Sequence, residues 1–246
     1  MSPSPSDSPE WVTRVHLAAC YRLCALNQWD DLIYTHISAA IPGEPDHYLI
    51  NPFGMQFDEI TASSLLKVNL QGKLLPHQSG IVNPSSFAIH GAIHRGRSDA
   101  QCVMHLHNTA GIAVSAQRDG LLPLSQHAMR FIGHLGYHDY EGLALTESEG
   151  ARLVAHLGNH PAMLLRNHGT LTVGRTVAEA YVVMATLIKA CEIQVAAFSS
   201  PNLIMPEPKI IKKTAADLHD LGAEEGVLEW PALLRKLDRI DPSYKQ

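Results

Sequence analysis

Three histidines combine a residue type and a spacing that could hold a metal ion. His105 and His107 stand in the run VMHLH, which is typical of a strand, and side-chain alternation places both imidazoles on one side of it. His168 lies in the turn-like run NHGT between two apolar stretches and could supply a third donor. Three protein ligands and one open position form a catalytic zinc arrangement. We therefore predict a divalent metal held by His105, His107 and His168.

A plainer interpretation of the HxH pair stays open. The two residues could be ordinary strand histidines, one hydrogen-bonded and one exposed, because short motifs recur by chance. The cysteines offer no second metal site: Cys20, Cys24, Cys102 and Cys191 contain no CxxC pair, which indicates neither a thiolate zinc site nor a disulfide framework.

Composition limits the class of protein. The 246 residues are enough for one large domain, and contents of 46% hydrophobic and 17% charged residues are typical of a globular chain. The net charge of −5 gives no reason to expect nucleic-acid binding. No apolar run approaches the ~20 residues of a membrane span, and residues 1–8 resemble a flexible lead-in rather than a signal peptide. We expect a cytoplasmic protein without membrane or nucleic-acid partners.

Helices and strands are predicted to interleave without regular βαβ alternation, which favours a mixed sheet covered by helices. The run Ser8-Pro9-Glu10 is typical of a helix start, and the capping boxes Thr146-x-x-Glu149 and Thr176-x-x-Glu179 predict two more. The predicted helices cover residues 9–28, 86–95, from 109, 146–158 and 176–198. The predicted strands cover residues 32–38, 48–51, 101–107, 162–166 and 171–173.

The character of the chain changes after residue 200. Pro201, Pro206 and Pro208 disfavour regular structure, and an amphipathic segment follows at residues 228–237. We predict a metal-binding domain at residues 9–200. Residues 201–246 are then a C-terminal extension that packs on the core or on a neighbouring subunit.

The sequence around the histidines resembles that of a known family. VMHLHNTAGIAVSA, YHDYEGLAL and MLLRNHGTLTVG are similar to the HxH, tyrosine-glycine and NHG segments of class II aldolase/adducin domains. YTHISAAIPG, LINPFGMQFDEITASSLLKVNLQG and NPSSFAIHGAIHRGRSDAQCV resemble the adducin branch and its bacterial relatives. The resemblance covers residues 11–200. It implies a three-layer α/β/α sandwich on a mixed, largely antiparallel sheet and a homotetramer. It also implies one divalent ion at the three histidines, zinc first, with manganese, cobalt or iron as alternatives.

Two positions depart from the aldolase pattern that this chain resembles. Where those enzymes carry a glutamate after the Ser-Ser pair, this chain has Phe87, whose ring cannot move a proton. The glycine-asparagine pattern for phosphate is replaced by a Thr-His-Ile-Ser run that contains His36. Phosphorylated substrates are therefore not favoured, and we expect Ser85, Ser86 and His36 to contact the substrate, the serines at a helix N-terminus.

Three residues are candidates for moving protons in place of the missing glutamate. His90 follows Ser86 by one helical turn, although a histidine bonded to a backbone carbonyl explains it equally well. His127 could replace the lost base, since imidazole is a common general base, but an ordinary loop histidine is a slightly better explanation. Tyr140 is similar to the family tyrosine that approaches a neighbouring subunit's site, and packing of its ring is the alternative.

Two classes of function remain. The first is an enzyme in which the metal chelates a small hydroxy- or keto-carbonyl substrate and stabilises an enediolate, as a carbon-carbon lyase or decarboxylase does. Its variant is an iron-dependent oxygenase, as in aminocoumarin-pathway enzymes of this fold. The second is a non-enzymatic assembly domain similar to the adducin head, although no long basic tail follows the domain. Three convergent imidazoles favour the enzyme.

Overall fold

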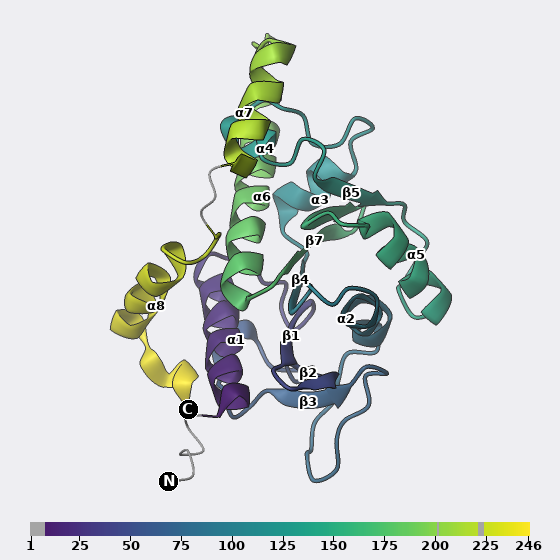
Figure 1. Ribbon diagram of the computed structural model, residues 1–246, viewed down its shortest axis with the longest axis vertical. Coiled ribbons are helices and arrows are strands. Elements are labelled where there is room, and N and C mark those ends of the chain that lie inside the picture. Colours follow the sequence, from purple (N-terminus) through teal and green to yellow (C-terminus); the bar gives the residue numbers. More distant parts are fainter. Residues whose placement is uncertain (1–7, 201, 221–223) are drawn as a thin grey trace.

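The computed structural model describes residues 8–200, 202–220 and 224–246, and its centre is a seven-stranded mixed sheet (Figure 1). The strand order is β3-β2-β1-β4-β7-β6-β5, and every neighbouring pair is antiparallel except β5 with β6. The strands are β1 (His36–Ile41), β2 (Glu44–Ile50), β3 (Leu66–Asn69), β4 (Cys102–Leu106), β5 (Leu135–His138), β6 (Ala162–Leu165) and β7 (Gly169–Gly174). The predicted sheet, mixed and largely antiparallel, is confirmed.

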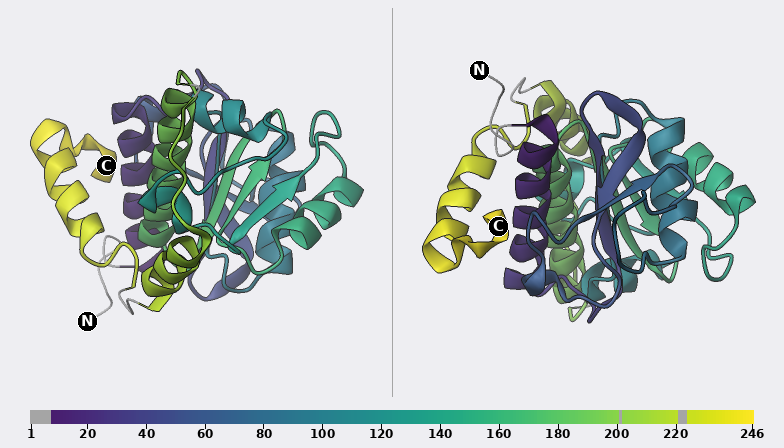
Figure 2. Two further views of the ribbon diagram at one scale, coloured as in Figure 1. Left: turned by 90° about the horizontal axis from the view of Figure 1, so that it is seen from above. Right: turned by 90° about the horizontal axis from the view of Figure 1, so that it is seen from below.

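Helices cover both faces of the sheet and complete an α/β/α sandwich (Figure 2). The long helices α1 and α6 lie on one face, and α2 and α5 lie on the other. The α-helices are α1 (Pro9–Leu26), α2 (Ala92–Gly96), α3 (Thr109–Ser115), α4 (Gln126–Met129), α5 (Glu147–Leu157), α6 (Val177–Ala197), α7 (Pro208–Asp220) and α8 (Glu229–Ile240). The predicted caps are present, because the Ser8, Thr146 and Thr176 side chains each accept a backbone N–H in the first turn.

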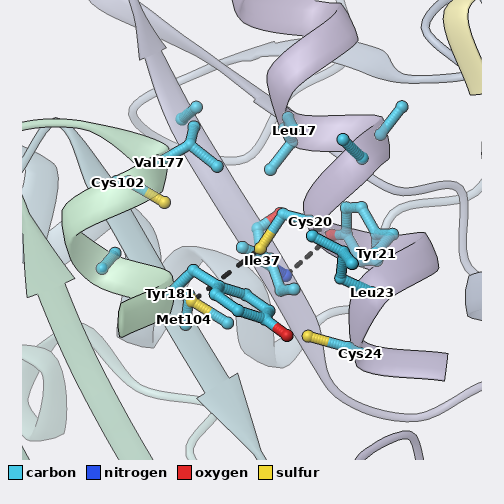
Figure 3. Close-up of a cluster of buried hydrophobic side chains, with 14 of the residues drawn as sticks. Leu17, Cys20, Tyr21, Leu23, Cys24, Ile37, Cys102, Met104, Val177 and Tyr181 are labelled. Atoms are coloured by element: carbon cyan, nitrogen blue, oxygen red, sulfur yellow. Dashed lines mark hydrogen bonds between the residues drawn. The ribbon is translucent and has the colours of Figure 1, made fainter. Parts of the chain in front are cut away.

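The largest core cluster lies between the sheet and the pair α1 and α6 (Figure 3). Strand alternation sends Cys102, Met104 and Leu106 of β4 into this cluster, while Val103 faces the opposite helix layer. His105 has the same parity as Val103, so it lies on the side away from the large cluster. The apolar face of β4 therefore holds the strand against the core, and the opposite face carries His105.

Tyr21 connects α1 to the strand that begins at His36. Its hydroxyl accepts the N–H of Ile37 at 2.7 Å and lies 2.5 Å from the Ile37 carbonyl and 2.8 Å from Oδ1 of Asn51. The β1 and β2 ladder ends at Ser38 and Ile50, so this hydroxyl bridges the position where the next backbone pair would form. It thereby fixes the start of β1.

Several predicted boundaries were wrong. The strand expected at 32–38 begins only at His36, since Leu32 and Thr35 have φ of 52° and 69°, which a strand does not permit. The helix expected at 86–95 is split into a π-helical turn (Phe87–Gly91) and α2. Strand β5 was not predicted, because its sequence LGYH has little alternation.

The C-terminal segment is more regular than its prolines suggested. Helix α7 begins at Pro208, where a missing N–H costs nothing, and it contacts α4. Helix α8 packs on α1 and α6 of the same chain, and Trp230 Nε1 donates to Nδ1 of His16 at 2.8 Å. Helix α8 thus lies against the core of its own chain (Figure 1).

Within the described ranges, α6 is the one helix long and apolar enough to cross a membrane by length and composition. Half of its apolar window is buried, and it contacts β7, α3 and α1. These features fit a helix packed in the core of the fold.

Removing the Tyr21 hydroxyl should destabilise the protein. Tyr21→Phe leaves a buried N–H of Ile37 without its partner, and we expect a loss of about 2 kcal/mol in the free energy of unfolding. Urea denaturation measures it. Tyr34→Phe is the control, because Tyr34 is 47% exposed. Equal stability of the two variants would contradict this role of Tyr21.

Candidate metal centre

The pairing of three adjacent strands brings the site histidines together. In the ladders, His36 of β1 lies opposite His105 of β4, and Leu106 lies opposite Thr170 of β7. His107 follows directly after β4, and His168 lies in the tight turn between β6 and β7. That turn needs Asn167 at φ 57° and a glycine at 169, where a Cβ would lie 2.4 Å from the Leu106 carbonyl oxygen.

The nitrogen atoms that His105, His107 and His168 can offer lie within 4.8 Å of one another. The Nδ1 of His105 lies 3.1 Å from the Thr170 carbonyl, which can only accept, so His105 donates through Nδ1 and presents Nε2. The Nδ1 of His107 lies 3.0 Å from Oδ2 of Asp31. Such partners on the outer nitrogen are the usual support of a metal-ligating histidine.

One atom of this group points to a missing ligand. The Nε2 of His107 is buried and finds no hydrogen-bond partner among the described residues. Buried polar atoms without partners are rare and require an explanation. A divalent cation shared with His105 and His168 would supply it, so the residues present fit a bound metal.

Burial also keeps the histidines neutral, which is the form that binds metals. Removal from water, with smaller contributions from His107 and His138, lowers the pKa of His168 to about 4. Burial and the neighbouring histidines hold the pKa of His105 well below its usual range. Near pH 7 these two imidazoles need to lose no proton before they can coordinate an ion.

A cavity of about 340 Å³ opens beside the three histidines. Ser85, His36 and the half-exposed Tyr140 line it, and the Tyr140 ring lies 6.3 Å from that of His168. Of the residues that the structure describes, no lysine, arginine, aspartate or glutamate lines this cavity. Its wall consists of Tyr34, Thr35, His36, Phe53, Asn83, Pro84, Ser85, His105, His107, Tyr140, Gly142, Leu143, Ala144, Leu145 and His168.

The structure separates the remaining candidates from this cavity. His90 is fully buried behind His36, with its Nε2 2.7 Å from the His36 Nδ1. Ser86 is buried and does not line the cavity, unlike its neighbour Ser85. His127 lies exposed on α4 and lines a different hollow between α6 and α8. His127 does not line the cavity beside the three histidines.

Phe87 does not take the place of a catalytic glutamate in space. Its side chain packs against the apolar cluster of Ala88, Ile89 and Ile93, and its Cβ approaches Gly72. It is absent from the residues that line the cavity. Phe87 is partly buried there and packs against the core rather than facing the cavity.

Sequence reasoning missed Asp31, Ser38 and His94. Asp31 is 76 positions from His107, and its own surroundings, WDD, carry no signal. The Ser38 hydroxyl lies between two histidines, 2.6 Å from Nδ1 of His90 and 2.7 Å from Nε2 of His94. The spacing of His90 and His94 by four residues was the available signal, since it places both on one helical face.

Comparison with known proteins gives a consistent result. Residues 15–195 match the family described as Class II Aldolase and Adducin N-terminal domain. A Pseudomonas aeruginosa protein named as a class 2 aldolase is 51% identical over 96% of this chain and 93% of its own length. Rat alpha-adducin is 40% identical over 95% of this chain, which spans about a third (34%) of adducin.

Solved structures agree with the sequence relatives. An aldolase II superfamily protein from Pseudomonas syringae has a TM-score of 0.92 at 49% identity, covering 100% of this chain and 98% of that one. The L-fuculose 1-phosphate aldolase of Glaciozyma antarctica has a TM-score of 0.82 at 25% identity, covering 100% and 97%.

Fold and site together define an α/β protein of the aldolase type with a cluster of histidines at the sheet. The chain belongs to the class II aldolase and adducin N-terminal domain family. The resemblance read from its sequence is confirmed.

The buried histidines should make stability depend on pH. Burial lowers the pKa of His36 to about 3 and that of His94 to about 4, from an ordinary value of 6.5. Below pH 6.5 the unfolded chain binds protons that the folded chain does not, so stability is full above pH 6.5 and falls towards pH 4. Each such histidine contributes up to about 1.4 kcal/mol per pH unit. Urea denaturation of metal-free protein at pH 7 and pH 5 measures the loss.

The matched variants for this prediction are His94→Phe and His127→Gln. His94→Phe should weaken the pH dependence by one histidine, and His127→Gln, at an exposed position of α4, is the control substitution. An unchanged slope in His94→Phe would contradict the assignment.

Proposed function

We propose that this protein is a divalent-metal-dependent enzyme acting on a small hydroxy- or keto-carbonyl substrate, as a carbon-carbon lyase or decarboxylase. The observation that carries the proposal is the convergence of three histidine nitrogens within 4.8 Å, with the buried Nε2 of His107 lacking a partner. The metal-binding domain is taken to span residues 9–200. By family resemblance we further propose a cytoplasmic homotetramer.

Each side chain of the site then has a role. His105, His107 and His168 would hold the ion, with the Thr170 carbonyl and Asp31 fixing two of the rings. Zinc suits three imidazoles best, and manganese, cobalt or iron are the alternatives. The ion would supply Lewis acidity towards a carbonyl oxygen.

The cavity residues would bind the substrate and move its protons. Ser85 and His36 face the cavity and can hydrogen-bond a substrate oxygen. Tyr140, at 55% exposure on the rim, could give a proton to a leaving oxygen. His90 contacts His36 rather than the cavity, so its role would be to orient that ring.

A non-enzymatic assembly domain is the second candidate. The 40% identity to rat alpha-adducin favours it, and so does the packing of a partly buried Phe87 where the aldolases that this chain resembles carry glutamate. An iron-dependent oxygenase on the same fold is a further alternative, which the identity of the bound metal distinguishes.

Metal content tests the site directly. Protein purified without a nickel column should carry about one equivalent of zinc, manganese or cobalt by plasma mass spectrometry, and iron would favour the oxygenase. His107→Ala should lose the metal because it removes a ligand. Asp31→Asn should weaken the affinity about 10- to 100-fold because it removes only the orienting carboxylate.

His127→Ala is the control for metal content, since this histidine lines a different hollow. Wild-type protein that takes up none of these metals would rule out the metal centre and favour the assembly domain.

Turnover separates the two candidate functions. A panel of hydroxy- and keto-carbonyl substrates should reveal lyase or decarboxylase activity in the metal-loaded wild type. Tyr140→Phe should then lower kcat by about 100-fold, because general acid catalysis is commonly worth at least that factor. Self-association by analytical ultracentrifugation, with no turnover on any substrate, would support the assembly domain instead.

A further inference from the structure

A continuous chain of hydrogen bonds runs from the backbone to the cavity on the histidine side of the sheet. It begins at the Ala100 carbonyl, which lies 2.9 Å from Nδ1 of His94. It continues through Nε2 of His94 to the Ser38 hydroxyl at 2.7 Å, and from there to Nδ1 of His90 at 2.6 Å. The Nε2 of His90 then lies 2.7 Å from Nδ1 of His36.

The first acceptor fixes the direction of every bond that follows. A carbonyl cannot donate, so His94 carries its proton on Nδ1 and its bare Nε2 accepts from Ser38. Ser38 has one proton, so it must accept from Nδ1 of His90. The bare Nε2 of His90 in turn accepts from Nδ1 of His36. His36 is left with a lone pair on Nε2.

The direction of the bonds follows from their geometry, and burial keeps the rings furthest from the cavity neutral. Loss of hydration lowers the pKa of His94 to about 4. Burial, with the nearby His36 and His94, holds the pKa of His90 well below its usual range. At neutral pH each imidazole has one N–H, and the Ala100 carbonyl decides where it lies.

At its cavity end, around His36 and Ser85, this series of hydrogen bonds has more acceptors than donors. The Nε2 of His36 lies 3.1 Å from the Ser85 hydroxyl, and Oδ1 of Asn83 lies 2.9 Å from the same oxygen. Oδ1 of Asn83 also accepts the Ser85 N–H, which favours this orientation of the amide. The single proton of Ser85 can satisfy only one of the two acceptors at a time.

A ligand group that donates a proton would complete this arrangement, whereas an anion would meet lone pairs. Within the described part of the chain the cavity wall contains no cationic lysine or arginine to hold phosphate or carboxylate. A neutral hydroxyl can donate to His36 and accept from Ser85 at once. The acceptor on His36 therefore discriminates between these two kinds of ligand.

We propose that the hydrogen-bonded series from Ala100 to His36 determines substrate specificity. It presents a fixed hydrogen-bond acceptor at His36 and selects an uncharged substrate hydroxyl over a phosphate group. The inference rests on the proposed function, because the substrate carbonyl next to that hydroxyl would bind at the three histidines. His90, Ser38 and His94 are positioning residues, which act through His36.

Nitrogen NMR of histidine-labelled, metal-free protein tests the device without any activity. At pH 7 we expect the Nδ1–H form for His36, His90 and His94, assigned with single His→Gln variants. An Nε2–H form of His36 in the wild type would overturn the proposal.

Two variants at a distance from the cavity test the direction of the hydrogen bonds. His94→Phe keeps a ring against Tyr48 but removes the acceptor for Ser38, so the Ser38 proton can turn to His90 and reverse the bonds. We expect the Nε2–H form of His36 to appear. Ser38→Ala should release His36 in the same way and serves if His94→Phe does not fold. A His36 spectrum unchanged in a folded variant would overturn the role of the chain.

Ligand preference is tested with two metal chelators that differ by one hydroxyl. Zinc-loaded wild type should bind glycolohydroxamate about five-fold more tightly than acetohydroxamate, the usual value of one hydrogen bond. His36→Phe should lose that preference, because the ring nitrogen that accepts from the added hydroxyl is gone. Equal binding of the two chelators by the wild type, or an unchanged preference in His36→Phe, would overturn the selection of a hydroxyl.

The failure of the proposed function would look different. A protein that takes up no zinc contradicts the metal centre, yet its His36 can still be examined in the metal-free state. There, dihydroxyacetone should shift the His36 nitrogen signal while acetone and phosphate do not. No shift with dihydroxyacetone would overturn the inference.

Discussion

The antiparallel register of β1, β4 and β7 is the constraint on which the site depends. Because side chains alternate along a strand, sliding β4 by one residue would turn His105 into the apolar cluster below α1 and α6. The apolar residues of β4, Met104 and Leu106 among them, make that slip costly. The same ladder sets His36 opposite His105, so the core that holds the sheet also places the histidines.

One face of the sheet stabilises the fold, and the other carries the buried histidines. On the α1 and α6 side, burial of apolar side chains stabilises the fold, and Tyr21 adds one hydrogen-bonded connection to β1. On the other side, a buried group of imidazoles costs hydration free energy, which hydrogen bonds to Thr170, Ser38 and Ala100 partly offset. Proteins retain such costly groups chiefly where they have a function.

The proposed site combines a family fold with an unusual set of side chains. Three histidines offer nitrogens within 4.8 Å of one another, with supporting contacts from Asp31 and Thr170. The resemblance to sugar-phosphate aldolases would place their acidic side chain where this chain has the partly buried Phe87, and their phosphate-binding pattern where it has the run around His36. Catalysis here would have to use neutral acids and bases, and the substrate would carry hydroxyls rather than charge. The relatives named as adducins and as aldolases show why fold alone does not decide between the two functions.

The sequence by itself determined the family, the mixed sheet and the three central histidines. Local rules were sufficient there, because HxH alternation, the NHG turn and the capping boxes at Thr146 and Thr176 are all read within a few residues. Only the tertiary structure decided the contacts between distant segments. These are Asp31 on His107, the hydrogen bonds from Ala100 to His36, the packing of Phe87 against the core and the placing of His127 in another hollow. Strand β5 was missed because its short sequence gains order from pairing with β6. Helix α7 was missed because the prolines before it suggested irregular structure, although Pro208 is tolerated at the first position of a helix.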